Sequence, residues 1–295
     1  MATRAFAVVN PAAGGGAAAR AWPRLADRLV RGRVDVTSAV TAASGDATRL
    51  ACRAAGDGHD LVIAVGGDGT VNEVVNGLLV SGASRVTLGV LPAGRGRDVC
   101  RNLGIPRDLD RAVDRVVHGS DVAVDVGVVD FGDRIRFFLG ATGAGFDADV
   151  ARRTQRHRGP ATLAYIAGVI EAVASLRPAL VTVTGAFEWT GRATAVVVAN
   201  GAFVGGGMKI APGADPADGA LDVVVLGDVG RLELLRWLPS VYRGDHVRHP
   251  RVVTARATEV RISAPTPLPV HVDGEPAGST PIVVSVRPGA LTVRR

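Results

Sequence analysis

The hydrophobic pattern of the first 120 residues alternates between two kinds of segment. Short apolar runs predict buried strands, and after most of them apolar residues recur at helical spacing. The predicted strands cover Arg4–Val9, Arg33–Val40, Leu61–Val65 and Val86–Leu91. The predicted helices cover Ala17–Val30, 46–55, 71–78 and Asp108–His118. This alternation is typical of an α/β domain with a largely parallel sheet.

Beyond about residue 120 the pattern becomes rich in strands. Asp121–Val129 alternates apolar and polar residues, as a half-buried strand does. Further strands are predicted at Arg134–Ala141, Leu180–Phe187, Arg192–Ala199, Leu221–Leu226, Val252–Ala255, Glu259–Ser263, Leu268–Val272, Pro281–Arg287 and Ala290–Val293. Helices are predicted at Ala148–Arg156, Ala161–Ser175 and Arg231–Tyr242. We therefore expect an N-terminal α/β nucleotide-binding domain over residues 1–120 and a C-terminal β-rich, sandwich-like domain over residues 121–295.

The most specific local signal is Gly66-Gly67-Asp68-Gly69-Thr70, between a fully apolar strand and a predicted helix. Its glycines would allow positive φ and close approach of a ligand. The amides at the start of the helix favour phosphate. Asp68 would repel a bare phosphate, so it implies a bridging cation or a hydroxyl partner. A plain strand–turn–helix is the alternative interpretation.

The string GGDGTVNEVVNG resembles the nucleotide loop of the diacylglycerol kinase and sphingosine kinase-type lipid kinases. NAD kinases and 6-phosphofructokinases have a related loop, but other segments favour the lipid kinases. These segments are Asn10-Pro11, Pro92-x-Gly94 with Asp98, Asp125-x-Gly127, Asp218-Gly219 and Asp273-Gly274-Glu275. The resemblance spans nearly the whole chain and implies an active-site cleft between the two domains.

The resemblance implies a nucleotide site in the first domain. The implied residues are Asn10, Thr41, Gly66, Gly67, Asp68, Gly69, Thr70, Asn72, Gly94, Arg95 and Asp98. The chain departs from the family pattern at Ala13, Arg95 and Arg97, where the family has serine, threonine and asparagine. The two arginines either bind phosphate in bidentate fashion or block the adenine side of the pocket, and the sequence leaves both interpretations open.

The resemblance also implies Mg²⁺ and a general base. Asp215, Asp218 and the carbonyl of Ala220 match the positions that hold a structural Mg²⁺ in the family, and such oxygen ligands suit a hard cation. Without the family, Asp218-Gly219 would indicate only a turn. Glu275 matches the carboxylate that accepts the proton of the lipid hydroxyl, and Asp273 would support it or bind metal.

The implied function is an ATP- and Mg²⁺-dependent kinase that phosphorylates the hydroxyl of a diacylglycerol-like or sphingoid-like lipid. Two alternatives stay open. One is a nucleotide- or lipid-binding protein of the same fold with impaired catalysis, suggested by Arg95 and Arg97. The other is a kinase for a non-lipid hydroxyl.

The composition of the chain limits the classes of molecule that we expect it to bind. The formal charge of +6 fits anionic lipid or nucleic acid, but only 4% of the residues are aromatic, which weighs against a single-strand nucleic-acid binder. We expect a lipid substrate and no nucleic acid. The basic run 152–158 fits either a solvated helix end or peripheral contact with an anionic membrane. With no signal peptide and no apolar run of about 18 residues, we expect a cytoplasmic protein, peripheral at most at the inner membrane face. A homodimer stays open.

Overall fold

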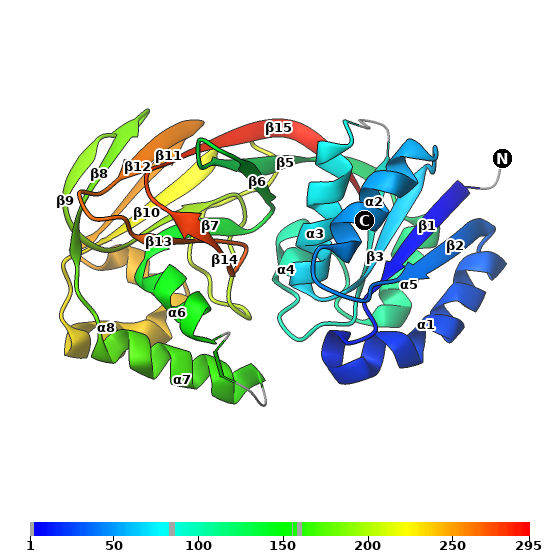
Figure 1. The fold of residues 1–295 in the computed structure, drawn as a ribbon, viewed down its shortest axis with the longest axis horizontal. Helices are drawn as coiled ribbons and strands as arrows, with labels where there is room; N and C mark the ends of the chain where they lie inside the picture. Colours follow the sequence, from blue (N-terminus) through cyan, green and yellow to red (C-terminus); the bar gives the residue numbers. More distant parts are fainter. Residues whose placement is uncertain (1–2, 83–85, 155, 158–160) are drawn as a thin grey trace. The chain divides into compact units, whose positions relative to one another are not determined.

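The computed structural model describes residues 3–82, 86–154, 156–157 and 161–295 of the 295-residue chain (Figure 1). The chain forms two compact units. The first comprises residues 1–126 together with 288–295, and the second comprises residues 127–287. The chain passes from one unit to the other within two strands, β5 (Asp121–Asp130) and β15 (Ile282–Arg294).

The first unit is built on a parallel sheet. In spatial order its strands are β2 (Val34–Val40), β1 (Thr3–Val9), β3 (Leu61–Gly66), β4 (Thr87–Pro92) and the end of β15. Its helices are α1 (Ala13–Arg31), α2 (Asp46–Gly56), α3 (Asp68–Val80), α4 (Asp98–Leu103) and α5 (Leu109–His118). Every residue of β3 and β4 is buried, because helices cover both faces of the sheet. This confirms the predicted α/β architecture.

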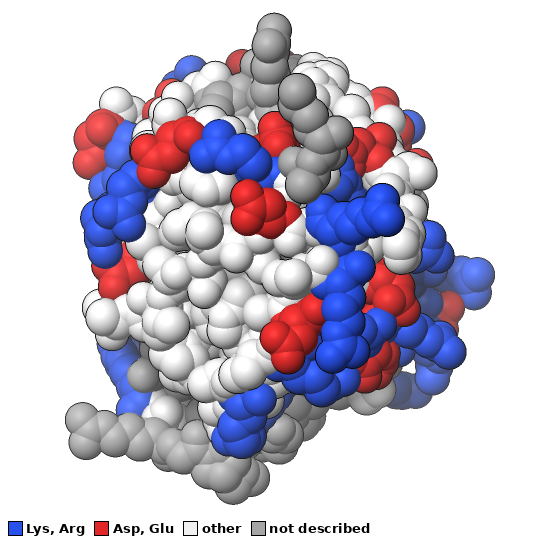
Figure 2. Space-filling view, turned by 90° about the vertical axis from the view of Figure 1, so that its right-hand side faces the viewer, with Lys and Arg blue, Asp and Glu red and all other residues white. Residues whose placement is uncertain are grey.

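The helical stripes seen in the sequence form the core of this unit. Leu25 and Leu29 of α1 and Val113 of α5 pack together against one face of the sheet, and each is at most 1% exposed. On the outside of the same helices, Arg28 forms ion pairs with Asp110 and Asp114, both at 2.6 Å. Figure 2 shows basic and acidic side chains close together around an uncharged area of one face. The net charge is therefore not concentrated into a single basic surface on this face.

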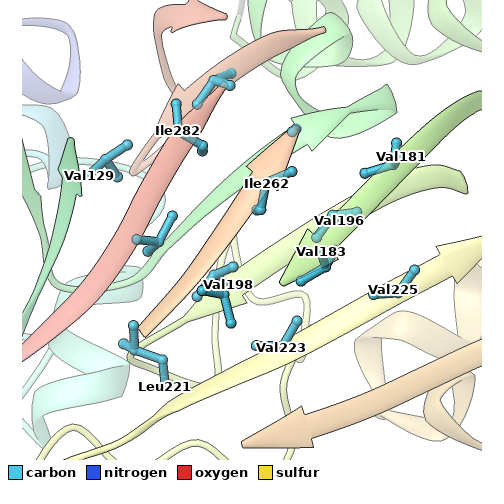
Figure 3. Close-up of a cluster of buried hydrophobic side chains, with 14 of the residues drawn as sticks. Val129, Val181, Val183, Val196, Val198, Leu221, Val223, Val225, Ile262 and Ile282 are labelled. Carbon is cyan, nitrogen blue, oxygen red and sulfur yellow. The ribbon is translucent and has the colours of Figure 1, made fainter. Parts of the chain in front are cut away.

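The second unit is mainly antiparallel, which confirms the predicted β-rich, sandwich-like part. Its sheet runs in the order β14-β13-β7-β9-β8-β12-β15, with β10 paired to β9 and β11, and β6 to β5. Its strands are β6 (Ile135–Phe138), β7 (Ala141–Gly145), β8 (Ala179–Gly185), β9 (Trp189–Ala199), β10 (Leu221–Gly227), β11 (Val252–Ala257), β12 (Glu259–Ser263), β13 (Pro269–Val272) and β14 (Glu275–Ser279), with parts of β5 and β15. Alternate residues of these strands point into one core, including Val181, Val183, Val196 and Val198 (Figure 3).

Helices α6 (Phe146–Thr154), α7 (Ala161–Ala174) and α8 (Arg231–Trp237) belong to the second unit. The predicted helix Arg231–Tyr242 was too long. It changes to a 3₁₀ helix over Leu238–Tyr242, because Pro239 has no N–H to continue the α-helical hydrogen bonds.

The predicted strand Arg134–Ala141 was wrong, because the segment divides into β6 and β7. At the break, the amides of Leu139, Gly140 and Ala141 donate hydrogen bonds of 2.9–3.1 Å to the Asp273 carboxylate. The glycine-rich stretch 142–145, which follows the predicted strand, forms most of strand β7. Long-range contacts therefore override the local pattern in this region.

Two predicted C-terminal strands form the single strand β15. Its bend lies at Gly289, which has a φ of 59° and donates its amide to Oδ1 of Asp125 at 2.8 Å. Asp125 is only 3% exposed. The Asp125-x-Gly127 match therefore has a structural role here, since it joins β5 to the C-terminal strand.

In the basic run 152–158, Arg152 and Arg153 both form ion pairs with Asp149, at 2.5 and 2.6 Å, while Arg158 lies outside the described residues. This pairing is what a solvated helix end would show. Among the residues that the structure describes, no helix is both long and apolar enough to cross a membrane.

Candidate functional site

The predicted nucleotide residues gather at one edge of the parallel sheet. Asn10 follows β1, Thr41 follows β2, Gly67 follows β3 and Gly94 follows β4. Because these strands are parallel, their carboxyl ends meet at the same edge, which is where open α/β sheets bind ligands. Residues up to 84 positions apart in the sequence are thereby brought into one site.

Hydrogen bonds connect the first of these loops to helix α3. The side-chain amide of Asn10 donates to Oγ1 of Thr70 at 2.9 Å, and its Oδ1 accepts the amide of Ala12 at 3.1 Å. Thr70 is only 6% exposed. Thr41 donates its backbone amide to the carbonyl of Val9 at 2.9 Å, so it is held at the end of the neighbouring strand. The hydrogen bond between Asn10 and Thr70 therefore joins the loop after β1 to the first turn of α3.

The glycines of the GGDGT loop are needed for space rather than for left-handed backbone. Gly67 has a φ of −93°, and the described glycines with positive φ do not include Gly66 or Gly69, so the expectation of positive φ was wrong. A methyl group built on Gly94 would lie 2.4 Å from the Cα of Gly67, and one on Gly66 would lie 2.5 Å from Oγ1 of Thr70. The loops after β3 and β4 thus touch through bare backbone.

Sequence reasoning missed the glycines that do have positive φ. Gly14, Gly15 and Gly16 are consecutive and have φ values of 63°, 68° and 87°. A methyl group on Gly14 would lie 2.2 Å from the carbonyl oxygen of Ala93. The run of three glycines that begins three residues after Pro11 was the available signal. The loop after β1 therefore packs on the loop after β4.

Two carboxylates flank Gly96. Oδ1 of Asp68 accepts the amide of Val99, in the first turn of α4, at 3.1 Å. Asp98 is 9% exposed and forms an ion pair with Arg101 at 2.5 Å. A methyl group on Gly96 would lie 2.5 Å from Oδ2 of Asp68 and 3.9 Å from Oδ2 of Asp98. The structure thus brings these two predicted residues together.

The two arginines that depart from the family pattern have different environments. Arg95 is exposed, and its Nη2 lies 3.9 Å from a methyl group built on Gly15. Arg97 has a φ of 58° and donates from Nε to the carbonyl of Gly94 at 2.9 Å. This left-handed backbone is one that asparagine adopts more readily than arginine. Arg97 therefore supports the loop, and Arg95 is the arginine that faces solvent.

Asn72 does not lie with the loop residues. It is 2% exposed, inside helix α3, and its Oδ1 accepts a hydrogen bond from Asn76 at 3.2 Å. Its burial favours a role within the helix rather than contact with a ligand.

The Asp273-Gly274-Glu275 segment forms the tight turn between β13 and β14 in the second unit. Asp273 and Gly274 have φ values of 47° and 81°, as a two-residue hairpin turn requires. Both carboxylate oxygens of Asp273 accept backbone amides of residues 139–141, and its own amide donates to the carbonyl of Ala141 at 2.9 Å. Asp273 therefore anchors the turn, and Glu275 is exposed beside it.

The predicted Mg²⁺ ligands lie in a turn before β10. Oδ1 of Asp215 accepts the amide of Ala217, and Oδ1 of Asp218 accepts that of Ala220, both at 3.1 Å. Arg256 forms an ion pair with Asp218. Within the described chain no group of three or more histidine, cysteine or acidic side chains could hold a metal ion, so a site here depends on the Ala220 carbonyl.

Next to this turn, the carboxylate of Asp222 is only partly satisfied by hydrogen bonds. Burial raises the pKa of Asp222, the charge of Arg256 opposes the increase and that of Asp218 adds to it. Oδ2 of Asp222 is buried and has no hydrogen-bond partner among the described residues. Asp222 does not combine with Asp215 and Asp218 into a group of three that could hold a metal ion, so its unpaired oxygen is not evidence for the predicted site.

Two family models match most of the chain. Residues 4–129 match the family model of the diacylglycerol kinase catalytic domain, and residues 140–295 match that of the YegS C-terminal NAD kinase β-sandwich-like domain. The chain is 34% identical to a diacylglycerol kinase of Mycobacterium tuberculosis, covering 98% of this chain and 94% of the relative. It is 32% identical to a diacylglycerol kinase of Bacillus subtilis, covering 94% and 91%.

A solved structure from Bacillus anthracis, assigned as a diacylglycerol kinase, superposes with a TM-score of 0.84 at 25% identity and covers 99% of this chain and 95% of its own. The fold and the matched loops define a kinase that acts on lipids. The chain belongs to the diacylglycerol kinase family of lipid kinases.

Proposed function

We propose that the protein transfers the γ-phosphoryl group of ATP to the hydroxyl of a diacylglycerol-like or sphingoid-like lipid, with Mg²⁺. The observation that carries this proposal is the convergence of the loops after β1, β2, β3 and β4 at one edge of the sheet. The names of the relatives, which are diacylglycerol kinases, favour a diacylglycerol-like acceptor.

In the first unit the loops bind the nucleotide phosphates. The first-turn amides of α3 have no partner within the helix, and the positive end of the helix dipole lies there, so both favour phosphate. The bare backbone at Gly67 and Gly94 lets a ligand approach closely. Asp68 accepts the amide of Val99, and Asp98 forms an ion pair with Arg101. Both contacts hold the start of α4 beside these loops.

In the second unit Glu275 is the general base. Its exposed carboxylate accepts the proton of the lipid hydroxyl as the hydroxyl oxygen bonds to the γ-phosphorus, the bond from the γ-phosphorus to the β,γ-bridging oxygen breaks, and ADP leaves. Asp273 is a positioning residue, because its carboxylate is used by the backbone amides of residues 139–141.

Asp215, Asp218 and the Ala220 carbonyl are proposed to hold Mg²⁺, because all three offer oxygen ligands, which suit a hard cation. An ion held there would be structural and would stabilise the turn before β10, whereas the Mg²⁺ that accompanies ATP would neutralise the charge that develops during transfer. A magnesium ion at this turn has to compete with Arg256 for Asp218.

The test is an acceptor panel. The purified protein is incubated with Mg²⁺ and γ-labelled ATP, and with diacylglycerol, sphingosine or glycerol in mixed micelles. We expect label in the lipid product with diacylglycerol and little with glycerol. Transfer to glycerol alone would identify a kinase for a non-lipid hydroxyl, and no transfer to any acceptor would reject the proposal.

A further inference from the structure

One buried histidine lies directly against the turn that carries Glu275. His271 is in β13, is 7% exposed and pairs in register with Gly143 of β7. Its Nε2 lies 3.0 Å from Oδ2 of Asp147, in the first turn of α6. Its Nδ1 lies 3.1 Å from the backbone nitrogen of Gly274, which donates to it. Both ring nitrogens are therefore used.

These two contacts define the state of the ring. A backbone N–H can donate to Nδ1 only if Nδ1 carries no proton, so the proton of the neutral ring is on Nε2. Nε2–H then donates to the Asp147 carboxylate. The carboxylate fixes the tautomer, and the tautomer leaves an acceptor for the Gly274 amide.

The Asp147–His271 pair fits because residue 143 is a glycine. A methyl group built on Gly143 would lie 1.7 Å from Oδ2 of Asp147 and 2.9 Å from Nε2 of His271. No side chain larger than hydrogen fits there without breaking the contact. The glycine in the middle of β7 is thus explained by the space that the Asp147–His271 pair needs.

We propose that His271, held by Asp147, is a positioning residue that fixes the Asp273-Gly274-Glu275 turn in the conformation that places Glu275 for proton abstraction. The proposal rests on the proposed role of Glu275 as general base. Asp273 holds one side of the turn through the amides of residues 139–141, and His271 holds the other side through Gly274. The residue that follows the held amide is Glu275 itself.

The consequence is a specific loss of rate. Without the acceptor on residue 271, the Gly274 amide has no fixed partner in this network, and the turn can rotate about residues 273 and 274. A displacement of about 1 Å at a reacting group can reduce the rate about 100-fold. Substrate binding that does not depend on Glu275 should be unaffected. We therefore expect kcat to fall while KM for ATP stays within twofold.

Two substitutions separate the contacts of the ring. His271→Asn keeps an acceptor near the position of Nδ1 and loses the donor to Asp147, whereas His271→Gln keeps a donor near Nε2 and loses the acceptor. We expect kcat of H271Q to fall 10- to 100-fold, and kcat of H271N to exceed that of H271Q at least fivefold. Equal kcat values for the two variants, or the reverse order, would overturn the proposal.

The chain offers a matched control. His249 is 6% exposed, has Nε2 at 3.2 Å from Glu233 and accepts the amide of Arg251 on Nδ1 at 3.1 Å. As in His271, Nδ1 accepts a backbone amide and Nε2 lies near a carboxylate, but His249 is not part of the Glu275 turn. We expect H249Q and H271Q to lower the thermal midpoint by similar amounts, with only H271Q losing kcat. Equal losses of kcat would mean that H271Q acts through general stability.

A double-mutant cycle tests whether His271 acts through Glu275. In the Glu275→Gln background, H271Q should reduce the residual rate less than twofold, because the group it positions is already inactive. A full 10- to 100-fold loss in that background would reject the positioning role of His271 and leave the assignment of Glu275 as general base intact. A fully active E275Q would reject the base assignment itself and His271 with it, so the two failures are distinguishable.

Discussion

The contact between Gly67 and Gly94 makes a quantitative prediction about the nucleotide site. A methyl group on Gly94 would lie 2.4 Å from the Cα of Gly67, while carbon atoms at ordinary contact are about 3.5 Å apart. The loops after β3 and β4 must therefore separate by about 1 Å in Gly94→Ala. The obstacle is backbone, so no rotamer change relieves it. Such overpacking costs about 1–3 kcal/mol of stability.

The functional loss should exceed the loss of stability. If these loops bind ATP, a displacement of about 1 Å should weaken Mg²⁺–ATP binding about tenfold and lower kcat/KM about 100-fold. Calorimetry with Mg²⁺–ATP and a steady-state kinase assay, both well below the thermal midpoint of the variant, measure these effects.

The matched control is Gly89→Ala, within strand β4, which precedes the Gly94 loop. Its methyl group would meet only side-chain atoms, the nearest at 3.3 Å on Val116, so the neighbours can move aside. We expect G89A to bind Mg²⁺–ATP like the unmodified protein. If G94A is folded and also has unchanged affinity and kcat/KM, the loops after β3 and β4 do not form the nucleotide site.

Three further outcomes are expected. Arg294 lowers the pKa of Asp121 by a paired hydrogen bond at 2.6 and 2.9 Å, so the pair stabilises the fold above pH of about 4 and ceases to do so as pH falls through the lowered pKa. Asp121→Asn should therefore lower the thermal midpoint at pH 7 and have little effect near pH 2; an equal effect at both would refute this. Arg95→Thr should weaken Mg²⁺–ATP binding about tenfold if the exposed guanidinium contacts phosphate, whereas tighter binding would show that Arg95 obstructs the site. Asp218→Asn should raise the Mg²⁺ concentration for half-maximal activity severalfold, and an unchanged Mg²⁺ dependence would remove Asp218 from the metal site.

Much of the first unit could be predicted from the sequence, because its signals are local. The apolar run Leu61–Val65 ends in three closely spaced glycines, and apolar residues then follow at helical spacing, so strand, loop and helix each have their own pattern. A parallel sheet also places successive strand ends at one edge, and this is why Asn10, Thr41 and Gly67 could be grouped before the structure was known.

What could not be predicted depends on contacts between distant residues. The break after Phe138 exists because Asp273, 133 residues after Gly140, takes the amides that would otherwise continue the strand. The need for glycine at Gly143 comes from Asp147 and His271, and the need at Gly94 comes from Gly67. The sequence shows that these residues are glycine, but only the fold shows which neighbour requires it.

The most direct test of the central claim compares binding with transfer in Glu275→Gln. The unmodified protein and the variant are titrated with Mg²⁺–ATP by calorimetry, and both are assayed for transfer of labelled phosphate from ATP to diacylglycerol in mixed micelles. We expect the affinity for Mg²⁺–ATP to agree within twofold and transfer by E275Q to fall about 1,000-fold, the middle of the range of about 100- to 10,000-fold for a positioned general base. A variant that binds ATP and transfers phosphate at the unmodified rate would contradict the account.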